Sequence, residues 1–579
     1  MDLLCPGRLE GRDLLASEEF DCNDGFGHGV FQRRMLALYA LSLFCLSSHI
    51  YSIPLIAKDV DHWCKRPPHA NVSTLDWKHV AIPLEADGHP SRCRMYEHPN
   101  DLNDTSTVPC TAWDYDDELA VTSVVSQWDL VCDRKFMLYA VPIVSIFSVA
   151  AFGITAGSAA DARGRRPVLM TSVGVLLVST VGLCVATTYA VHSAMKVIAS
   201  GSVSAANIVT GVLLFEVTTH ENRPLHVVVA GAVAVVITDL WGAIMGPMKV
   251  HWALKQAVFL APTYLSASTL CLVIESPRWL VSKARYRATE DAMLAAADAN
   301  KFPLQNTASL MNKLKAKAAG KSDQSNRSFD LDVLQGVSVR KRSLVAFFSC
   351  FSIYFVLRVV VLSSVMRAAT ILPWISFGVV ALSLAAMLFV ITKVTMLVFI
   401  STCFAMLGVV LCLLSLASGL EPVILSQALA VCAKALGLIG NIVWGAYSLE
   451  LFPTAVRGTA FGWIYGFGGL GAVSAAVIVR LKAVGREDVV FAVSGSLMFA
   501  SLLAVGMLPR NTTVECARTA VRRASFSKQQ SMEHMRNTLE VKEDRATADT
   551  GSLRGRNTRR DKSRSKKSTP SSGSIASKR

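Results

Sequence analysis

Charged side chains stand inside several long apolar segments of this sequence. Asp239, Arg358 and Lys434 each lie well within such a segment, and Lys196 lies near the start of another. A charge in the middle of a bilayer costs at least about 2.5–3.5 kcal/mol, so it usually faces a cavity or a partner. We therefore predict that Lys434, Arg358 and Asp239 line a central path, whose chemistry is the recognition of a charged molecule.

Aromatic residues in the same segments could complete that path. The candidates are Tyr354, Trp374, Trp444 and Tyr465. Ring faces attract organic cations, and rings can also stack on organic anions beside a basic group. Packing against lipid or at the membrane interface is the alternative for each of them. Asp239 is also the candidate site for a coupling proton.

The segment 157–167 places small residues and a cluster of charges between two apolar segments. Glycines allow helices to approach closely, and Asp161 can accept hydrogen bonds from guanidinium groups of a facing segment. The arginines would hold the turn at the lipid headgroups. Because these charges can pair only when one side of the protein is closed, we interpret the segment as a latch; a membrane anchor is the alternative. Its residues are Gly157, Asp161, Arg163, Gly164, Arg165 and Arg166.

A pair of opposite charges occurs at matching places in the two halves of the chain. Glu216 and Arg223 flank one turn, and Glu450 and Arg457 flank another, both with a separation of seven positions. Each turn also contains a proline. The pattern indicates a parallel internal repeat with matching ion pairs, which is typical of carriers whose halves rock against each other. Chance charges at membrane turns are the alternative.

The polar segment 58–135 holds four cysteines and two glycosylation acceptors. The cysteines are Cys64, Cys93, Cys110 and Cys132, and the acceptors are Asn71 and Asn103. This combination predicts an extracellular domain that is tied by disulfides. Four cysteines allow three pairings, and the sequence does not choose between them.

The elements that must position these residues are apolar segments long enough to cross a bilayer. The chain of 579 residues is 52% hydrophobic and 17% charged, which is too apolar for a soluble protein. Because about 20 apolar residues span a membrane, we predict an all-α membrane protein with twelve transmembrane helices in two six-helix bundles. The segments are 35–57, 136–159, 168–190, 194–216, 225–246, 252–274, 343–365, 370–391, 394–418, 422–446, 458–480 and 489–508.

Two long polar segments and a polar tail complete the predicted organisation. The net charge of +15 gathers in the tail and beside the apolar segments, as expected of cytoplasmic flanks rather than of a nucleic-acid-binding protein. We therefore expect a multi-pass plasma-membrane protein with both termini in the cytoplasm. Its parts are a cytoplasmic N-terminus (1–34), a first bundle (35–274) with an extracellular loop (58–135), a cytoplasmic central loop (275–342), a second bundle (343–508) and a disordered basic tail (509–579).

Several motifs resemble those of one family. Segment 157–167 is similar to the signature of the major facilitator superfamily, and Glu275-Ser276-Pro277-Arg278-Trp279-Leu280 resembles the segment after its helix six. Segments 127–135 and 450–457, with the cysteine-bearing loop, resemble the organic cation, anion and zwitterion transporters, solute carrier family 22. The resemblance covers about residues 20–510. It implies the major facilitator fold, adds Glu275 and Arg278 to the latch, and matches Lys434 to a lysine of the tenth helix.

The sequence also departs from that family. Segment 391–396 lacks most of the charge expected in a second latch, and Gly469 stands where cation carriers tend to place an aspartate and anion carriers an arginine. The motif expected after Leu508-Pro509 is missing too. The chain therefore resembles a divergent member of solute carrier family 22.

The resemblance implies transport of small organic ions, such as cations, anions or carnitine-like zwitterions, by alternating access in a lipid bilayer. A sugar or polyol carrier of the same superfamily is one alternative. A transport-inactive receptor or scaffold is another, suggested by the eroded second latch. We expect no enzyme activity, cofactor or metal site, because the sequence has no nucleotide-binding loop, metal-ligand spacing or nucleophile elbow.

Overall fold

The computed structural model describes most of the chain between residues 25 and 508. The described ranges are 25–66, 74–85, 88–98, 105–115, 122–219, 222–319, 337–367, 372–418, 423–452, 454–480 and 486–508. The predicted glycosylation acceptors Asn71 and Asn103 and the predicted disordered tail lie outside these ranges. Those three expectations stay predictions.

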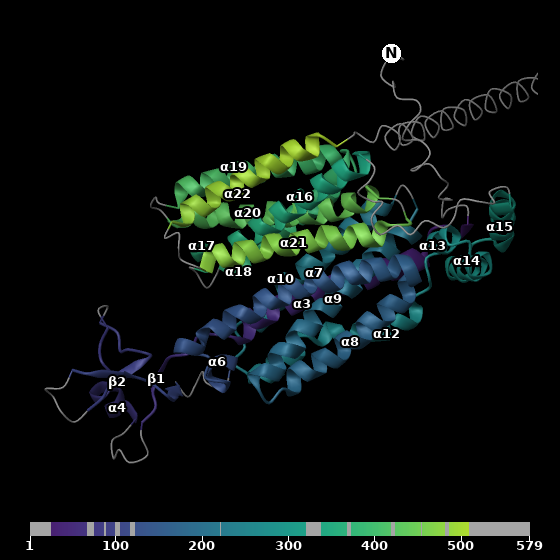
Figure 1. Cartoon of the computed structure of the whole chain (residues 1–579). Helices are drawn as coiled ribbons and strands as arrows, with labels where there is room; N and C mark the ends of the chain where they lie inside the picture. The colour runs from purple at the N-terminus through teal and green to yellow at the C-terminus, as the bar shows by residue number, and fades with distance from the viewer. Residues whose placement is uncertain are drawn as a thin grey trace, which may run out of the picture. The chain divides into compact units, whose positions relative to one another are not determined.

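The first half of the chain is a bundle of long apolar helices (Figure 1). Almost the whole of α9 from Ala199 onward is buried, so this helix is the centre of the half. The bounds are α3 Val30–Ile56, α7 Phe136–Arg163, α8 Arg165–Val185, α9 Tyr189–Val217, α10 Arg223–Met245, α11 Trp252–Phe259, α12 Ala261–Ser268 and the 3-10 turn η2 Leu270–Leu272.

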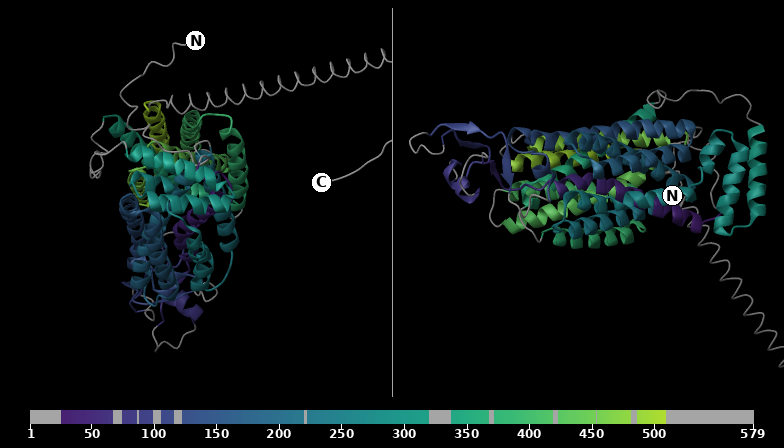
Figure 2. Two further views of the ribbon diagram at one scale, coloured as in Figure 1. Left: turned by 90° about the vertical axis from the view of Figure 1, so that its right-hand side faces the viewer. Right: turned by 90° about the horizontal axis from the view of Figure 1, so that it is seen from below.

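The second half repeats this arrangement and lies against the first (Figures 1 and 2). Large apolar side chains point outward from both halves, for instance Val178, Leu382 and Ile424, each at least 73% exposed. Such surfaces suit lipid and not water. The bounds are α16 Val337–Leu362, α17 Ser364–Arg367, α18 Leu372–Ile391, α19 Met396–Ala417, α20 Val423–Glu450, α21 Arg457–Arg480 and α22 Glu487–Gly506.

One predicted span differs from an unbroken helix. In the described ranges, eleven helices are long and apolar enough to cross a membrane. The predicted segment 252–274 is instead divided into α11, α12 and η2. Pro262 lies in the first turn of α12, and a proline both removes a backbone donor and displaces the carbonyl four residues earlier. This sixth predicted segment is therefore present as a broken helix.

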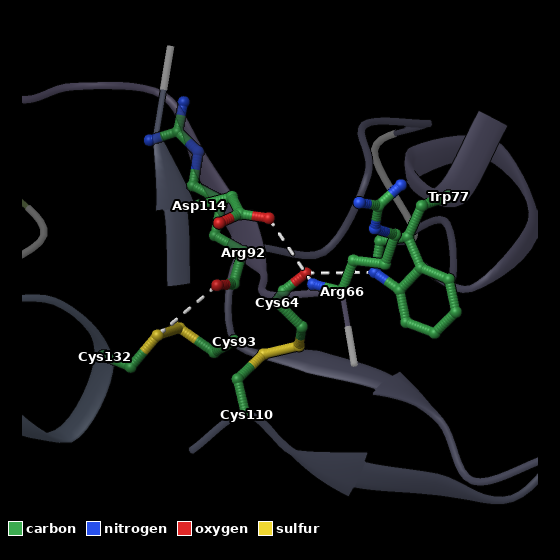
Figure 3. The surroundings of a disulfide bond; sticks show 8 residues. All are labelled: Cys64, Arg66, Trp77, Arg92, Cys93, Cys110, Asp114 and Cys132. Atoms are coloured by element: carbon green, nitrogen blue, oxygen red, sulfur yellow. Dashed lines mark hydrogen bonds between the residues drawn. A yellow bond between two sulfur atoms is a disulfide. The ribbon is translucent and has the colours of Figure 1, made fainter. Parts of the chain in front are cut away.

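The cysteine-bearing segment forms a small domain at one end of the bundles (Figure 1). Two antiparallel pairs, β1 with β4 and β2 with β3, carry very little core of their own. The pairing that the sequence left open is Cys64–Cys110 and Cys93–Cys132 (Figure 3). The elements are β1 His62–Cys64, α4 Thr74–Val80, β2 Arg94–Tyr96, β3 Thr107–Pro109, β4 Trp113–Tyr115, α6 Val124–Gln127 and η1 Cys132–Lys135.

The two disulfides give this loop domain the stability that its size cannot supply. Cys64–Cys110 ties β1 to the segment before β4, and Cys93–Cys132 ties the segment before β2 to the entry of α7. The indole Nε1 of Trp77 also donates to the Cys64 carbonyl at 3.1 Å (Figure 3). His62 lies close to Cys93 and Cys132. Because both thiols are consumed by the disulfide, this trio offers no thiolate ligands to a metal.

The central loop forms three helices at the opposite end of the bundles: α13 Pro277–Ser282, α14 Tyr286–Asn300 and α15 Leu304–Ala319 (Figures 1 and 2). Asn300 joins them to the start of α3. Its Oδ1 accepts from the Phe31 amide at 2.8 Å, and its Nδ2 donates to the Phe26 carbonyl at 2.9 Å. The central loop is therefore attached to the first half.

Candidate functional site

The two halves meet most closely where α7 crosses α21. A Cβ added to Gly157 would overlap the carbonyl of Gly458, and one added to Gly462 would lie 2.6 Å from the carbonyl of Gly153. Only glycine permits backbones to come this close. The crossing brings the charged turn after α7 against the start of α21, at the end of the bundles that carries α13–α15.

Asp161 binds the first turn of α21 from across this interface. Its carboxylate accepts from the amides of Gly458 at 3.2 Å and Thr459 at 2.7 Å, and from the Thr459 hydroxyl at 2.9 Å. The first amides of a helix lack partners inside the helix and carry partial positive charge. Asp161 therefore caps a helix of the other half. The sequence predicted guanidinium donors from a facing segment, and the structure supplies backbone amides and a hydroxyl instead.

Arg165 is the centre of the latch. It is 0% exposed, so the expectation that it reaches the lipid headgroups is wrong. Its guanidinium makes two bonds to Glu216, at 2.8 and 3.1 Å, and an ion pair with Asp161 at 3.0 Å. It also donates to the Thr454 carbonyl of the second half at 3.0 Å. Arg163, in contrast, is exposed, as a headgroup anchor would be.

Glu216 connects the halves through charge. Besides Arg165, it contacts Arg457 of α21 at 3.5 Å, so its contacts extend beyond the predicted partner Arg223. Arg223 donates through Nε to the Thr218 carbonyl at 3.2 Å. Glu216 comes from the first predicted charge pair and Arg457 from the second, and these two residues contact each other where the two halves meet. Glu450 ends α20 beside this junction.

The motif after the sixth segment supports the same turn. Glu275 accepts from the amides of Arg165 at 2.8 Å and Arg166 at 3.1 Å, so it caps α8. Trp279 donates from its indole to the Asp161 carbonyl at 3.0 Å. Arg278 is buried in the same short helix, α13. We call Asp161, Arg165, Glu216, Glu275 and Arg457 the latch cluster.

A second group of charges lies farther along the interface. Lys434 of α20 bonds to Asp239 of α10 at 2.8 Å and to the hydroxyl of Ser376 of α18 at 3.1 Å. Both charged side chains are only 13–15% exposed. This ion pair joins the two halves and brings two of the three predicted path charges together.

Arg358 is the third predicted path charge. Tyr51 of α3 interacts electrostatically with Lys434, Asp239 and Arg358, which places all four groups around one region. Among the described residues no carboxylate lies within ion-pair distance of Arg358, and its buried Nε has no hydrogen-bond partner. Two positive groups against one carboxylate leave one net positive charge. We call Tyr51, Asp239, Arg358, Ser376 and Lys434 the chamber cluster.

Tyrosines from both halves adjoin the chamber cluster. Tyr354 lies one helical turn before Arg358, and its ring is 6.0 Å from the ring of Tyr465. The side chain of Tyr465 interacts with that of Tyr39 of the first half, and the side chain of Tyr354 interacts with that of Asn441. The predicted tyrosines are therefore part of an interface network.

The other two predicted aromatics are placed differently. Trp444 is 1% exposed and packs against Phe404 of α19, with ring centres 6.0 Å apart. It belongs to the packed interior of the second half. Trp374 is 48% exposed, so it is not part of the buried interface network. For both residues the structure favours the packing alternative over the path.

Sequence reasoning missed Tyr51, Ser376 and Tyr39. None of them carries a charge, and the sequence of an apolar helix does not indicate which neutral polar side chain faces the other half. Gly469, where the family places a substrate-charge residue, packs beside Ile146 of α7. Among the described residues, the charge of the chamber cluster that has no counter-charge is Arg358 on α16.

Comparison with known proteins agrees with this architecture. The "Sugar (and other) transporter" family matches residues 134–512. Solute carrier family 22 member 7 of Mus musculus is 25% identical over 491 residues, covering 79% of this chain and 88% of that protein. Organic cation/carnitine transporter 2 of Mus musculus is 25% identical over 47% of this chain and 52% of its own length. A proton:xylose symporter of the major facilitator superfamily, XylE, has a TM-score of 0.57 at 14% identity, covering 83% of this chain and 96% of XylE.

Proposed function

Because this chain belongs to the "Sugar (and other) transporter" family, we propose that it carries small organic anions across the plasma membrane by alternating access between its two halves. Its relatives confirm the predicted resemblance to solute carrier family 22. The observation that carries this proposal is the chamber cluster, in which an ion pair joins the halves and Arg358 has no counter-charge among the described residues. A buried unpaired guanidinium is costly, and a carboxylate or sulfonate can pair with it through two hydrogen bonds.

The latch cluster supports the proposed cycle. Alternating access needs one end of the protein to close while the other opens. Here α7 and α21 are in contact at the end that carries α13–α15, and the charges there are paired across the halves. With both termini and α13–α15 in the cytoplasm, this arrangement is the one closed to the cytoplasm. The disulfides of the loop domain support the opposite end as the extracellular one.

The chamber charge weighs against the alternatives. The fold likeness to a xylose symporter extends to architecture alone, and a neutral sugar would leave Arg358 without a counter-charge. If no labelled ion enters the cells, the result favours the transport-inactive receptor. The test is uptake of a labelled organic anion, cation and zwitterion into cells expressing the chain. Saturable anion uptake that unlabelled anion competes away supports the proposal. Surface-expressed protein with no uptake above background overturns it.

A further inference from the structure

Lys196 is a buried amine that neither cluster uses. It lies on α9 inside the first half, is 3% exposed, and donates to the His49 carbonyl and, at 2.7 Å, to the Ser52 hydroxyl. Both partners are neutral. Among the described residues no carboxylate lies within ion-pair distance of Lys196, and the ionisable groups that interact with it are the imidazoles of His49 and His192. A lysine in this position needs a different explanation from that of an ion pair.

The hydrogen bonds of Lys196 match an uncharged amine. A neutral amine has two N–H groups, and the two acceptors from α3 satisfy both of them. An ammonium has a third N–H group that needs another acceptor. The arrangement therefore leaves a nitrogen lone pair in the interior of the bundle, ready to take up a proton.

Two histidines stand beside that lone pair. His192 lies four residues before Lys196, on the same face of α9. Its Nε2 is 3.4 Å from Gln256 Oε1, an oxygen that only accepts, so Nε2 carries the hydrogen. Its Nδ1 is then an acceptor, and it is buried without a partner, as is Nδ1 of His49. Both histidines interact with Lys196. A side-chain rotation that brings one of these nitrogens to Nζ would give a protonated Lys196 the acceptor for its third N–H group.

We propose that Lys196, together with His192 and His49, is a proton-binding site inside the first half, and that its protonation strengthens anion binding at the chamber cluster. The second clause rests on the proposed function. Hydronium from bulk solvent donates the proton to the Lys196 Nζ lone pair and leaves as water, so the site gains one positive charge. Three helices surround Lys196: α3 contributes His49 and Ser52, α12 contributes Thr263, and α11 contributes Gln256. Lys255 of α11 lies beyond Gln256, and its amine donates to the carbonyls of Gly246 and Met248.

Helix α3 links this site to the chamber cluster. His49 and Ser52 contact Lys196, whereas Tyr51, between them in sequence, interacts with Lys434, Asp239 and Arg358. A positive charge at a distance on the order of 10 Å, in a dielectric of about 20, changes the binding of a monoanion about tenfold. The Michaelis constant for the anion should therefore be lower when Lys196 is protonated.

Two variants fix the two charge states. Lys196→Met has no proton to gain, and Lys196→Arg keeps its charge throughout. The measurement is the KM for a labelled monoanion at external pH 5.5 and 8.5, with the membrane potential clamped. For the wild type we expect a KM about tenfold higher at pH 8.5. Lys196→Met should have the high value at both pH values, and Lys196→Arg the low one. A wild-type pH response that persists in Lys196→Met overturns the proposal.

His28→Gln is the matched control. His28 and His226 form a separate imidazole pair, with ring centres 5.1 Å apart, at the start of α3 and α10. This variant should keep the wild-type pH response of KM. If the wild type carries no organic ion, the proposed function fails by itself. The proton site is then tested by the melting temperature of the purified chain from pH 5.5 to 8.5. Different pH slopes for wild type and Lys196→Met support it, and identical slopes overturn it.

Discussion

The latch cluster and the chamber cluster both place buried charges between the two halves, but they balance those charges differently. In the latch cluster, Arg165 has partners in Glu216, Asp161 and the Thr454 carbonyl. In the chamber cluster, Lys434 is paired with Asp239, and Arg358 has no counter-charge among the described residues. Charges that stabilise one conformation need oppositely charged partners within the protein. A charge that binds a ligand must instead lack such a partner, so that the ligand can supply the opposite charge.

Removing the centre of the latch cluster should have the largest effect. Arg165→Met leaves the buried carboxylates of Glu216 and Asp161 without their main partner, which costs about 3–5 kcal/mol. We expect little folded protein at the cell surface, measured by surface labelling and by the melting temperature of purified protein. Arg163→Met, two positions away and exposed, is the control and should behave as the wild type. Normal surface expression and melting of Arg165→Met would contradict the assignment.

Breaking the chamber ion pair should abolish transport while folding persists. Lys434→Ala leaves Asp239 unpaired between the halves, and we expect uptake to fall by about 100-fold or more, as a loss on the order of 3 kcal/mol implies. Surface expression should survive, because both side chains keep some exposure. Lys393→Ala, an exposed lysine between α18 and α19, should leave uptake unchanged. Wild-type uptake by Lys434→Ala would remove this pair from the path.

The close crossing of α7 and α21 gives a steric test. Gly157→Ala would place a methyl group against the Gly458 carbonyl and force the halves apart at the latch. We expect about tenfold slower uptake, in the range of an overpacking cost of 1–3 kcal/mol. Gly174→Ala is the matched control, since its added Cβ would meet open space. Equal uptake by both variants would show that the crossing tolerates a side chain.

The smallest expected effect is a pH dependence of the stability of the loop domain. Burial lowers the pKa of His62, although its hydrogen bond to the Val60 carbonyl raises the pKa in part. Because the folded pKa lies below the unfolded value, stability is full above about pH 6.5 and is lost as the pH falls through the lowered pKa. Because a thiol reductant loses its thiolate as the pH falls, the rate of reduction is divided by that of an unfolded disulfide peptide at the same pH. On this scale the neighbouring Cys93–Cys132 bond should open a few-fold faster at pH 5 than at pH 7.5. His62→Gln should remove this difference, and a difference that persists would assign it to another group.

The sequence predicted most of the latch cluster because its residues sit in spaced motifs around helix ends. Asp161, Arg165, Glu216 and Arg457 were all named from such spacing, and the structure brings them together. The burial of Arg165 was not predictable, since an arginine in a membrane turn usually reaches the headgroups. The disulfide pairing could not be chosen either, because it depends on which strands of the loop domain pair.

The chamber cluster was predictable only where it carries charge. Asp239, Arg358 and Lys434 stood out because charges are costly in apolar helices. Trp444 and Trp374 were named on aromatic character alone, and the rotation of their helices turns them away from the path. The sixth predicted span, 252–274, also could not be read as two short helices, because hydropathy does not reveal how a helix bends at Pro262.

Whether Arg358 selects anions is tested by comparing the preference for anions over cations in the wild type, Arg358→Gln and Arg358→Lys. We predict that the wild type prefers the anion and that Arg358→Lys keeps most of this preference. Arg358→Gln should lower the anion-to-cation uptake ratio about tenfold or more at equal surface expression. A ratio that is unchanged in Arg358→Gln, or a wild type that prefers cations, would contradict this prediction.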